Sequence, residues 1–229
     1  MAERIRTDET IAKDVIDSLS WDSRVDASHV SVTVDRGIVT LTGTVSSYSS
    51  RMVASEDAWL ITGARKVENQ LKVVFQVEVP SDDEIKTNIE HAITSDNDLY
   101  PYDIQVDVVA GSVTLGGTVD EFSKKVRVED MASRMRGVVG VTNKIVVVLT
   151  DLIEDEILAE TIINALDRNV NVNVDDINVA VENGTVFLNG TVPNGSAKRA
   201  AYDTARYTLG VKEVKDHIIV SIPVKTPQG

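Results

Sequence analysis

One sequence pattern occurs three times along the chain, and this repeat constrains the fold more than any other feature. The segment GIVTLTGTV at 37–45 returns as GSVTLGGTV at 111–119 and as GTVFLNGTV at 184–192, at offsets of 74 and 73 residues. Offsets of this length exceed those of solenoid repeats, which run to roughly 20–50 residues. We therefore predict three tandem modules, at residues 1–77, 78–150 and 151–229.

Each module begins with the pattern of an amphipathic helix. In the second module, the stretch Ser81-Asp82-Asp83-Glu84 has the form of a capping box. Ile85, Ile89 and Ile93 follow it at a spacing that places them on one helical face. Two strands with alternating apolar residues come next, joined by a tight turn, and the Asn183-Gly184 turn of the third module is the clearest hairpin signal.

A second helix and a third strand complete the pattern. The second helices are predicted at 49–62, 123–136 and 196–209, and the third strands at 67–74, 141–148 and 214–221. A right-handed crossover makes the third strand parallel to the second. The fold class is therefore α+β, with three tandem α-β-β-α-β modules. Each module has two helices packed on one face of a three-stranded mixed sheet, which leaves the other face open.

Two glycine positions recur in every module. Gly43, Gly117 and Gly190 interrupt the second strand, where a glycine costs stability. We expect a helix backbone to cross close to the sheet there, and a ligand approaching the backbone is the alternative. A second set follows the second helix, where the C-terminal position favours a positive φ. Its members are Gly63, Gly137 and Gly210.

Composition excludes several classes of function. The net charge of −13 disfavours a nucleic-acid partner, which requires a basic surface. There is no cysteine, so no disulfide and no zinc–thiolate site is possible. No apolar run is long enough to predict a transmembrane segment. The N-terminus has no secretory signal, so we expect a cytoplasmic location for the chain as it stands, with the periplasm as the alternative if a signal was removed.

Acidic residues gather in the loops that precede the first strands of the second and third modules. Clustered carboxylates suit a hard cation such as calcium, although turn formation explains the same residues. The candidate ligands are Asp96, Asp98, Asp103, Asp175 and Asp176. The three modules share no polar constellation, so we predict no catalytic residues, no cofactor and no enzyme.

Aromatic side chains and sheet edges are the remaining candidate contact surfaces. The aromatic residues are either binding anchors or fillers of gaps between modules. The six that we single out are Trp21, Trp59, Tyr100, Tyr102, Tyr202 and Tyr207. Unpaired edge strands of three-stranded sheets could pair between modules or between chains, which would give an oligomer.

The repeated skeleton resembles the bacterial OsmY and nodulation (BON) domain over nearly the whole chain. The resemblance rests on the pattern Gly-x-Val-x-Leu-x-Gly-x-Val, a helix of small residues, and Gly-Val-x-x-Val-x-Asn before an apolar strand. The second module carries the last motif in full, from Gly137 to Asn143. The first has Ala64 after its glycine but keeps Asn69, and the third has Asp216 at the asparagine position.

The resemblance implies a function that composition does not reveal. It implies a non-enzymatic binding or scaffold protein in osmotic or envelope stress response. The partner would be an anionic phospholipid, a protein or a small ligand. The alternative is a cytoplasmic protein that binds or senses a cation: the resemblance implies potassium, and the acidic loops suggest calcium.

Overall fold

The structure, a computed structural model, describes residues 6–149 and 153–221. The module boundary predicted between residues 150 and 151 lies outside these ranges. The first module contains α1 (Asp8–Trp21), η1 (Ala27–His29), β1 (Val30–Asp35), β2 (Ile38–Val45), α2 (Tyr48–Leu60), β3 (Lys66–Asn69) and β4 (Lys72–Val73). The second contains α3 (Asp82–Thr94), β5 (Ile104–Val109), β6 (Ser112–Val119), α4 (Phe122–Ser133), β7 (Gly140–Asn143) and β8 (Val146–Val147). The third contains α5 (Asp155–Asp167), η2 (Val174–Asp176), β9 (Ile177–Glu182), β10 (Thr185–Val192), α6 (Gly195–Arg206) and β11 (Glu213–Val220).

Each module has a mixed sheet with its second strand in the centre. In the first module β1 runs antiparallel to β2, and β3 and β4 run parallel to it. The same pairings hold in the second and third modules. The α+β fold and its three α-β-β-α-β modules are therefore confirmed.

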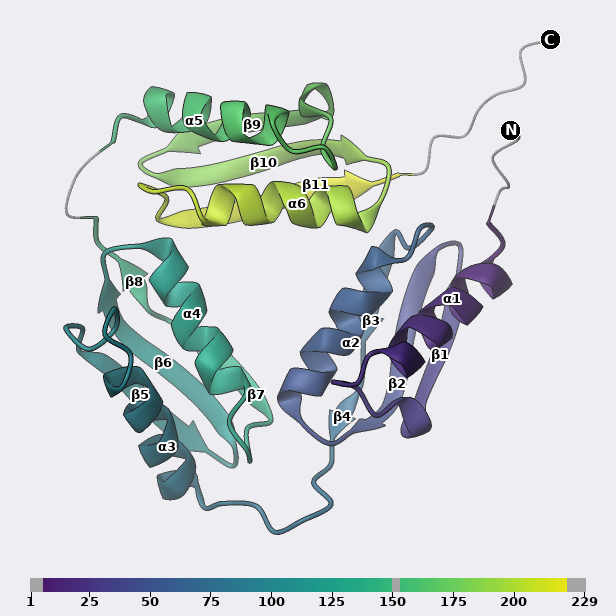
Figure 1. Ribbon diagram of the computed structural model, residues 1–229, viewed down its shortest axis with the longest axis vertical. Helices are drawn as coiled ribbons and strands as arrows, with labels where there is room; N and C mark the ends of the chain where they lie inside the picture. Colours follow the sequence, from purple (N-terminus) through teal and green to yellow (C-terminus); the bar gives the residue numbers. More distant parts are fainter. Residues whose placement is uncertain (1–5, 150–152, 222–229) are drawn as a thin grey trace.

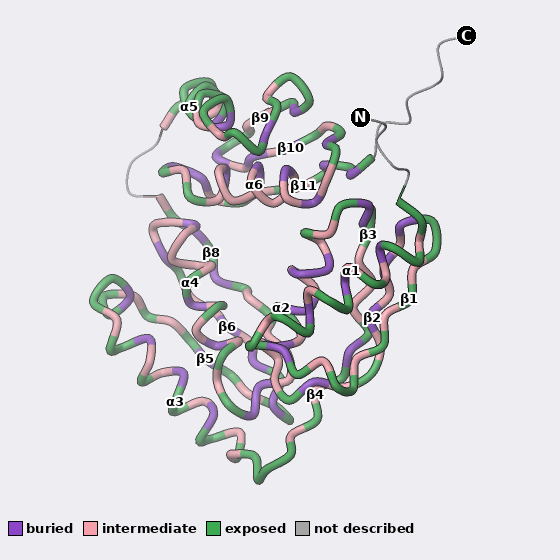
Figure 2. The backbone as a smooth tube through the Cα atoms, turned by 45° about the vertical axis from the view of Figure 1, so that its right-hand side comes forward, coloured by how far each residue is buried: buried purple, intermediate pink, exposed green. Residues whose placement is uncertain are grey.

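The core of each module lies between its helices and one face of its sheet. The isoleucine stripe of α3 is buried, as are Val113 and Leu115 of the central strand β6. Small residues of the second helix, Ala132 among them, allow it to lie close to the sheet. In Figure 2 each module carries its own buried segments, drawn in purple.

The third strand differs from the prediction in the first two modules, where it breaks into two short strands. The break follows Asn69, whose Nδ2 donates to the Arg51 carbonyl of α2 at 2.6 Å. Its Oδ1 accepts from the Leu71 amide at 3.1 Å. Asn143 makes the equivalent bonds in the second module. The asparagine thus ties the strand to the helix and bends it.

In the third module the strand β11 is continuous, because Asp216 cannot donate to a helix carbonyl. Its Oδ1 still accepts from the Ile218 amide at 2.9 Å. Lys198 of α6 forms a link in the opposite direction: its Nζ donates to the Ile218 carbonyl of the strand at 2.6 Å and lies 3.3 Å from the second oxygen of Asp216. A lysine–aspartate pair therefore replaces the asparagine link.

The strand glycines are required by a neighbouring strand, so our expectation of a crossing helix was wrong. Gly43, Gly117 and Gly190 have φ values of +108°, +112° and +151°. A Cβ at Gly117 would overlap the carbonyl oxygen of Asp103, which immediately precedes β5. His29 and Asp176 take the same place in the other modules.

An aspartate at the start of the first helix holds the hairpin turn of every module. The Asp82 carboxylate accepts from the amides of Ala110 and Gly111 at 2.7 and 2.9 Å. Asp8 and Asp155 bind the corresponding turns in the same way. The sequence placed Asp82 in a capping box and predicted no bond from it to the turn. The offsets of 74 and 73 residues between the three aspartates were the signal for a shared role.

The three modules lie around a common centre, and each presents its second helix toward it (Figure 1). The helices α2, α4 and α6 face the centre, while α1, α3 and α5 lie farther out. The C-terminal end of α2 meets the N-terminal end of α6, where Gly195 lies against the Trp59 carbonyl. This contact joins the first module to the third, so the three modules form a closed ring.

Candidate ligand site between the modules

The centre of the ring is a cavity of about 910 Å³ lined by residues of all three modules. A volume of this size falls within the range of small-molecule sites. Met52, Val126 and Arg199 occupy the same position on α2, α4 and α6, and all three line the cavity. The repeat therefore places equivalent helix positions around the cavity, and the side chains at these positions differ between modules.

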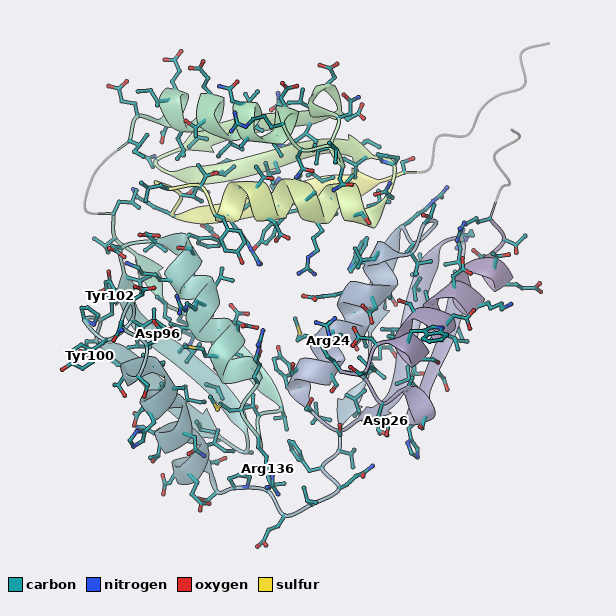
Figure 3. The ribbon with its side chains drawn as sticks, viewed as in Figure 1. Arg24, Asp26, Asp96, Tyr100, Tyr102 and Arg136 are labelled. Atoms are coloured by element: carbon teal, nitrogen blue, oxygen red, sulfur yellow. The ribbon has the colours of Figure 1, made fainter. Side chains whose placement is uncertain are left out.

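The cavity wall is charged. Its cationic side chains are Arg24, Lys124, Arg127, Arg134, Arg199 and Arg206. Its acidic side chains are Glu56, Asp98, Glu121 and Asp130. Figure 3 shows Arg24 on the side of the first module that faces the centre.

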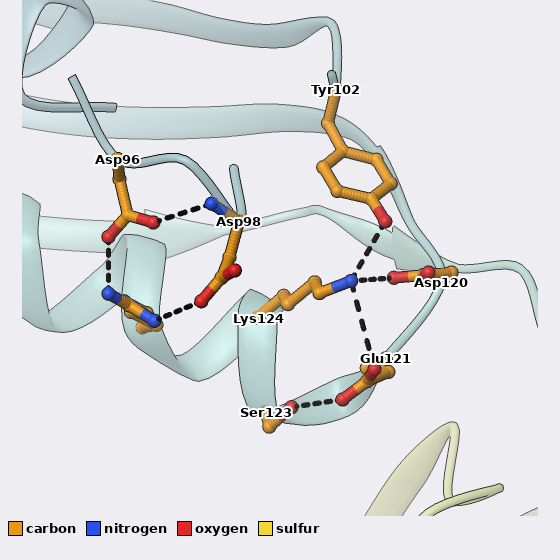
Figure 4. Close-up of polar contacts among 8 residues, drawn as sticks. Asp96, Asp98, Tyr102, Asp120, Glu121, Ser123 and Lys124 are labelled. Carbon is orange, nitrogen blue, oxygen red and sulfur yellow. Dashed lines mark hydrogen bonds and ion pairs between the residues drawn. The ribbon is translucent and has the colours of Figure 1, made fainter. Parts of the chain in front are cut away.

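The wall of the second module is held by two groups of polar contacts, which Figure 4 shows. Asp96 and Asp98 converge on the guanidinium of Arg127, at 2.5 and 3.1 Å. Lys124 Nζ lies 2.7 Å from Asp120 and 2.9 Å from the Tyr102 hydroxyl. Burial alone would lower the pKa of Lys124, but these hydrogen bonds outweigh it and raise the pKa. Lys124 is therefore a cation over the whole physiological range.

An ion pair crosses the contact between the first and third modules. Arg199 Nη1 lies 2.9 Å from a Glu56 carboxylate oxygen, and Lys198 Nζ lies 5.7 Å from the centre of the Trp59 ring. Burial opposes the charge of Arg199, but the bond to Glu56 prevails, so the pKa of Arg199 is raised. Trp59 thus fills a gap between modules, one of the two roles predicted for the aromatic residues.

The predicted cation ligands do not come together as one group. Asp96 and Asp98 meet at Arg127, whereas Asp103 precedes β5 and Asp175 and Asp176 lie in η2 of another module. Across residues 6–149 and 153–221, no three His, Asp or Glu side chains are placed to hold a metal ion. Cation binding at these loops stays a prediction.

Sequence reasoning missed the cavity and its arginines. The available signal was the helix face that points away from the sheet. In an otherwise acidic chain, the second helices and their C-terminal ends carry four arginines: Arg127, Arg134, Arg199 and Arg206. The predicted role of those helices rested on the small residues that pack on the sheet. The faces that point away from the sheet line one cavity only when the ring closes.

One carboxyl group is buried beside the cavity wall of the first module. Asp57 of α2 is 7% exposed, and its Oδ2 has no hydrogen-bond partner among the described residues. Burial and the nearby Asp22 carboxylate raise the pKa of Asp57 to about 6. Hydrogen bonds from Arg24 lower the pKa of Asp22 to about 2, so Asp22 stays charged.

We expect Asp57 to make the first module less stable as the pH rises from about 4 to 6. The folded state holds this proton more tightly than the unfolded state does, so stability is lost as the group ionises. Asp57→Asn should remove this dependence. Both tryptophans lie in the first module, so urea unfolding followed by tryptophan fluorescence reports on it. The free energy of unfolding of the parent should fall relative to that of Asp57→Asn by about 1–2 kcal/mol between pH 5 and 7.5. A constant gap would contradict the assignment.

No helix in the described ranges combines the length and the apolar character that crossing a membrane requires. Each module has an exposed apolar or aromatic side chain at the end of its first helix or in the loop that follows it. Trp21 is 88% exposed, Tyr100 is 71% exposed and Val170 is 98% exposed. Figure 3 shows Tyr100 at the periphery of the second module, away from the central cavity.

Comparison with known proteins identifies one family. The BON domain family matches residues 7–74, 81–148 and 154–221, which together span most of the chain. Solved structures with some similarity include CdsD, a structural protein of the type III secretion system of Chlamydia trachomatis. It shares 12% identity over 92% of each chain, with a TM-score of 0.27. Its C-terminal domain shares 13% identity over 96% of this chain and 100% of that chain, with a TM-score of 0.26. Similarity this low informs neither fold nor function. No curated protein matches the chain.

Proposed function

Because this chain belongs to the BON domain family, we propose that it is a non-enzymatic binding scaffold whose three modules enclose a shared ligand site. The observation that carries this proposal is the central cavity of about 910 Å³, to which all three modules contribute. A site at the junction of domains is a common place for small ligands. Three of the four acidic residues that line it are bound by arginines that also line it, an arrangement that favours binding over catalysis.

A small panel of ligands tests the proposal. Sodium triphosphate, citrate, spermine and glycine betaine cover anionic, cationic and zwitterionic chemistry. At least one of them should raise the unfolding temperature of the intact chain, because a ligand that binds only the folded state stabilises it. The effect should disappear in Ser49→Trp, which fills the cavity at a lining residue whose side chain makes no hydrogen bond in the described structure.

Ser31→Trp is the matched control, since Ser31 is exposed on β1. It adds the same bulk away from the cavity and should leave the ligand effect intact. If none of the four ligands stabilises the chain, or if Ser49→Trp keeps the full effect, the cavity is not the binding site.

We assign the scaffold to osmotic or envelope stress on the strength of its family resemblance. Under this assignment, its cellular abundance should increase at least several-fold after an osmotic upshift or envelope damage. Quantitative mass spectrometry of the source cells measures this. Constant abundance under both treatments would contradict the assignment.

An anionic phospholipid surface is the second candidate partner, favoured by the exposed Trp21, Tyr100 and Val170. Large apolar side chains that project from the surface can enter the interface of a bilayer. The chain should then float with vesicles of anionic phospholipid, and the triple variant Trp21→Ser, Tyr100→Ser and Val170→Ser should stay in the bottom fraction. A parent chain that never floats excludes this candidate.

A further inference from the structure

The central cavity gathers arginine in a chain that is otherwise acidic. Five of the twelve arginines line it, together with Lys124. Its wall has six cationic and four acidic side chains, whereas the whole chain has 23 Lys and Arg against 36 Asp and Glu. Field lines concentrate in a partly enclosed space. The side chains that line the cavity therefore have a positive balance that the chain as a whole does not have.

A carboxylate orients each of these arginines and leaves part of its guanidinium available. Arg24 binds Asp22 through Nε and Nη2, and Nη1 donates to no other described residue. Arg134 uses Nε and Nη2 on Asp130 in the same way. Arg24 is held by Asp22, and Arg206 is held by Asp203. Neither aspartate lines the cavity, so each binds its arginine on the side away from the cavity.

The guanidinium of Arg206 is the least satisfied of the group. Its Nε is buried without a hydrogen bond, although Asp203 Oδ1 lies 3.2 Å away. Its Nη2 donates to the Tyr207 hydroxyl at 2.7 Å, and its guanidinium carbon lies 4.6 Å from the centre of the Tyr207 ring. A cation stacked in this way keeps its remaining donors in one plane.

The four acidic residues of the wall are themselves paired. Glu56 is bound by Arg199, Asp98 by Arg127, and Asp130 by Arg134. Lys124 lies 3.7 Å from Glu121. These pairs fix the arginine forks in advance, which reduces the cost of ordering them around a ligand. They also disfavour weakly charged anions, because a ligand must compete with these carboxylates for the arginines.

We propose that the cavity binds a small anion with several linked phosphate groups. Planar guanidinium forks match the oxygens of phosphate, and each bond between them is charge-assisted. The arginines come from all three modules, so a ligand that reaches them must carry charge at more than one point. Such a ligand would tie the modules together. This inference rests on the proposed function, which places the ligand site in the cavity.

Isothermal titration with sodium triphosphate tests the proposal. The test variant is Arg134→Gln, because this side chain is 68% exposed and its one ion-pair partner among the described residues is Asp130 of its own helix, so the fold should persist. Arg168→Gln is the matched control, since it removes the same charge from an exposed residue at the end of α5. Circular dichroism verifies that both variants are folded.

Triphosphate should bind the parent chain, and Arg134→Gln should weaken it about tenfold, the loss expected for one charge-assisted hydrogen bond. Arg168→Gln should bind within twofold of the parent. Equal losses in both variants, no binding at millimolar triphosphate, or equally tight binding of citrate would each overturn the proposal.

The ligand panel distinguishes failure of the phosphate proposal from failure of the proposed scaffold function. If spermine or glycine betaine stabilises the chain through the cavity while triphosphate does not bind, the scaffold function stands and the phosphate ligand is excluded. If none of the panel acts through the cavity, both are excluded.

Discussion

Replacing Gly117 by alanine should lower the free energy of unfolding of the second module by about 3 kcal/mol or more. Two causes add together. Gly117 has φ +112°, a conformation that side chains strain. An added Cβ would also overlap the Asp103 carbonyl oxygen, which belongs to the backbone and cannot rotate away. The hairpin of β5 and β6 would have to separate at its open end, where Ile104 pairs with Gly117.

Gly116→Ala provides a control in the same strand. Gly116 has no positive φ, and the nearest atoms to an added Cβ lie 3.8 Å away. This variant should change stability by less than about 1 kcal/mol. Urea unfolding followed by circular dichroism, with hydrogen exchange of the β6 amides, distinguishes the two. Equal stability of the two variants would mean that the strand glycine is not required by its neighbour.

Replacing Gly195 by alanine should open the ring while leaving the third module folded. Gly195 is the first residue of α6 and its φ is not in the positive region, so alanine suits its own helix. The added Cβ would overlap the Trp59 carbonyl oxygen of the first module. The two modules must then move apart, which also separates Arg199 from Glu56.

Fluorescence of Trp59 measures this opening in a Trp21→Phe background. Trp59 is partly buried and packs against the core shared by the second and third modules. Opening exposes it to water, so the emission of Gly195→Ala should shift to longer wavelength and triphosphate binding should fall at least tenfold. Gly140→Ala, where an added Cβ meets nothing within 4 Å, should change neither property. An unshifted emission in Gly195→Ala would contradict the contact.

Much of each module could be predicted because its determinants are local. The stripe of Ile85, Ile89 and Ile93 and the alternating valines specify which faces are buried. Turn residues with positive φ, such as Asn183 and Gly184, fix the hairpins. These signals occur three times, so each module verifies the interpretation of the others.

Other features depend on partners that are distant in sequence. The approach of the Asp103 carbonyl to Gly117 and the bond from Asn143 to the Lys125 carbonyl cannot be read from either segment alone. The cavity is the extreme case, because it exists only between modules. Each arginine on α4 and α6 has the appearance of an ordinary exposed residue until the ring places it opposite another helix.

Small-angle X-ray scattering of the parent chain tests the central claim most directly, since a shared site requires a closed ring. The closed arrangement of Figure 1 predicts a compact particle with a single-peaked distance distribution that fits the structure. Gly195→Ala should then have a larger radius of gyration and a longer maximum dimension. A parent chain that scatters as an extended string, indistinguishable from Gly195→Ala, would contradict the ring and the ligand site within it.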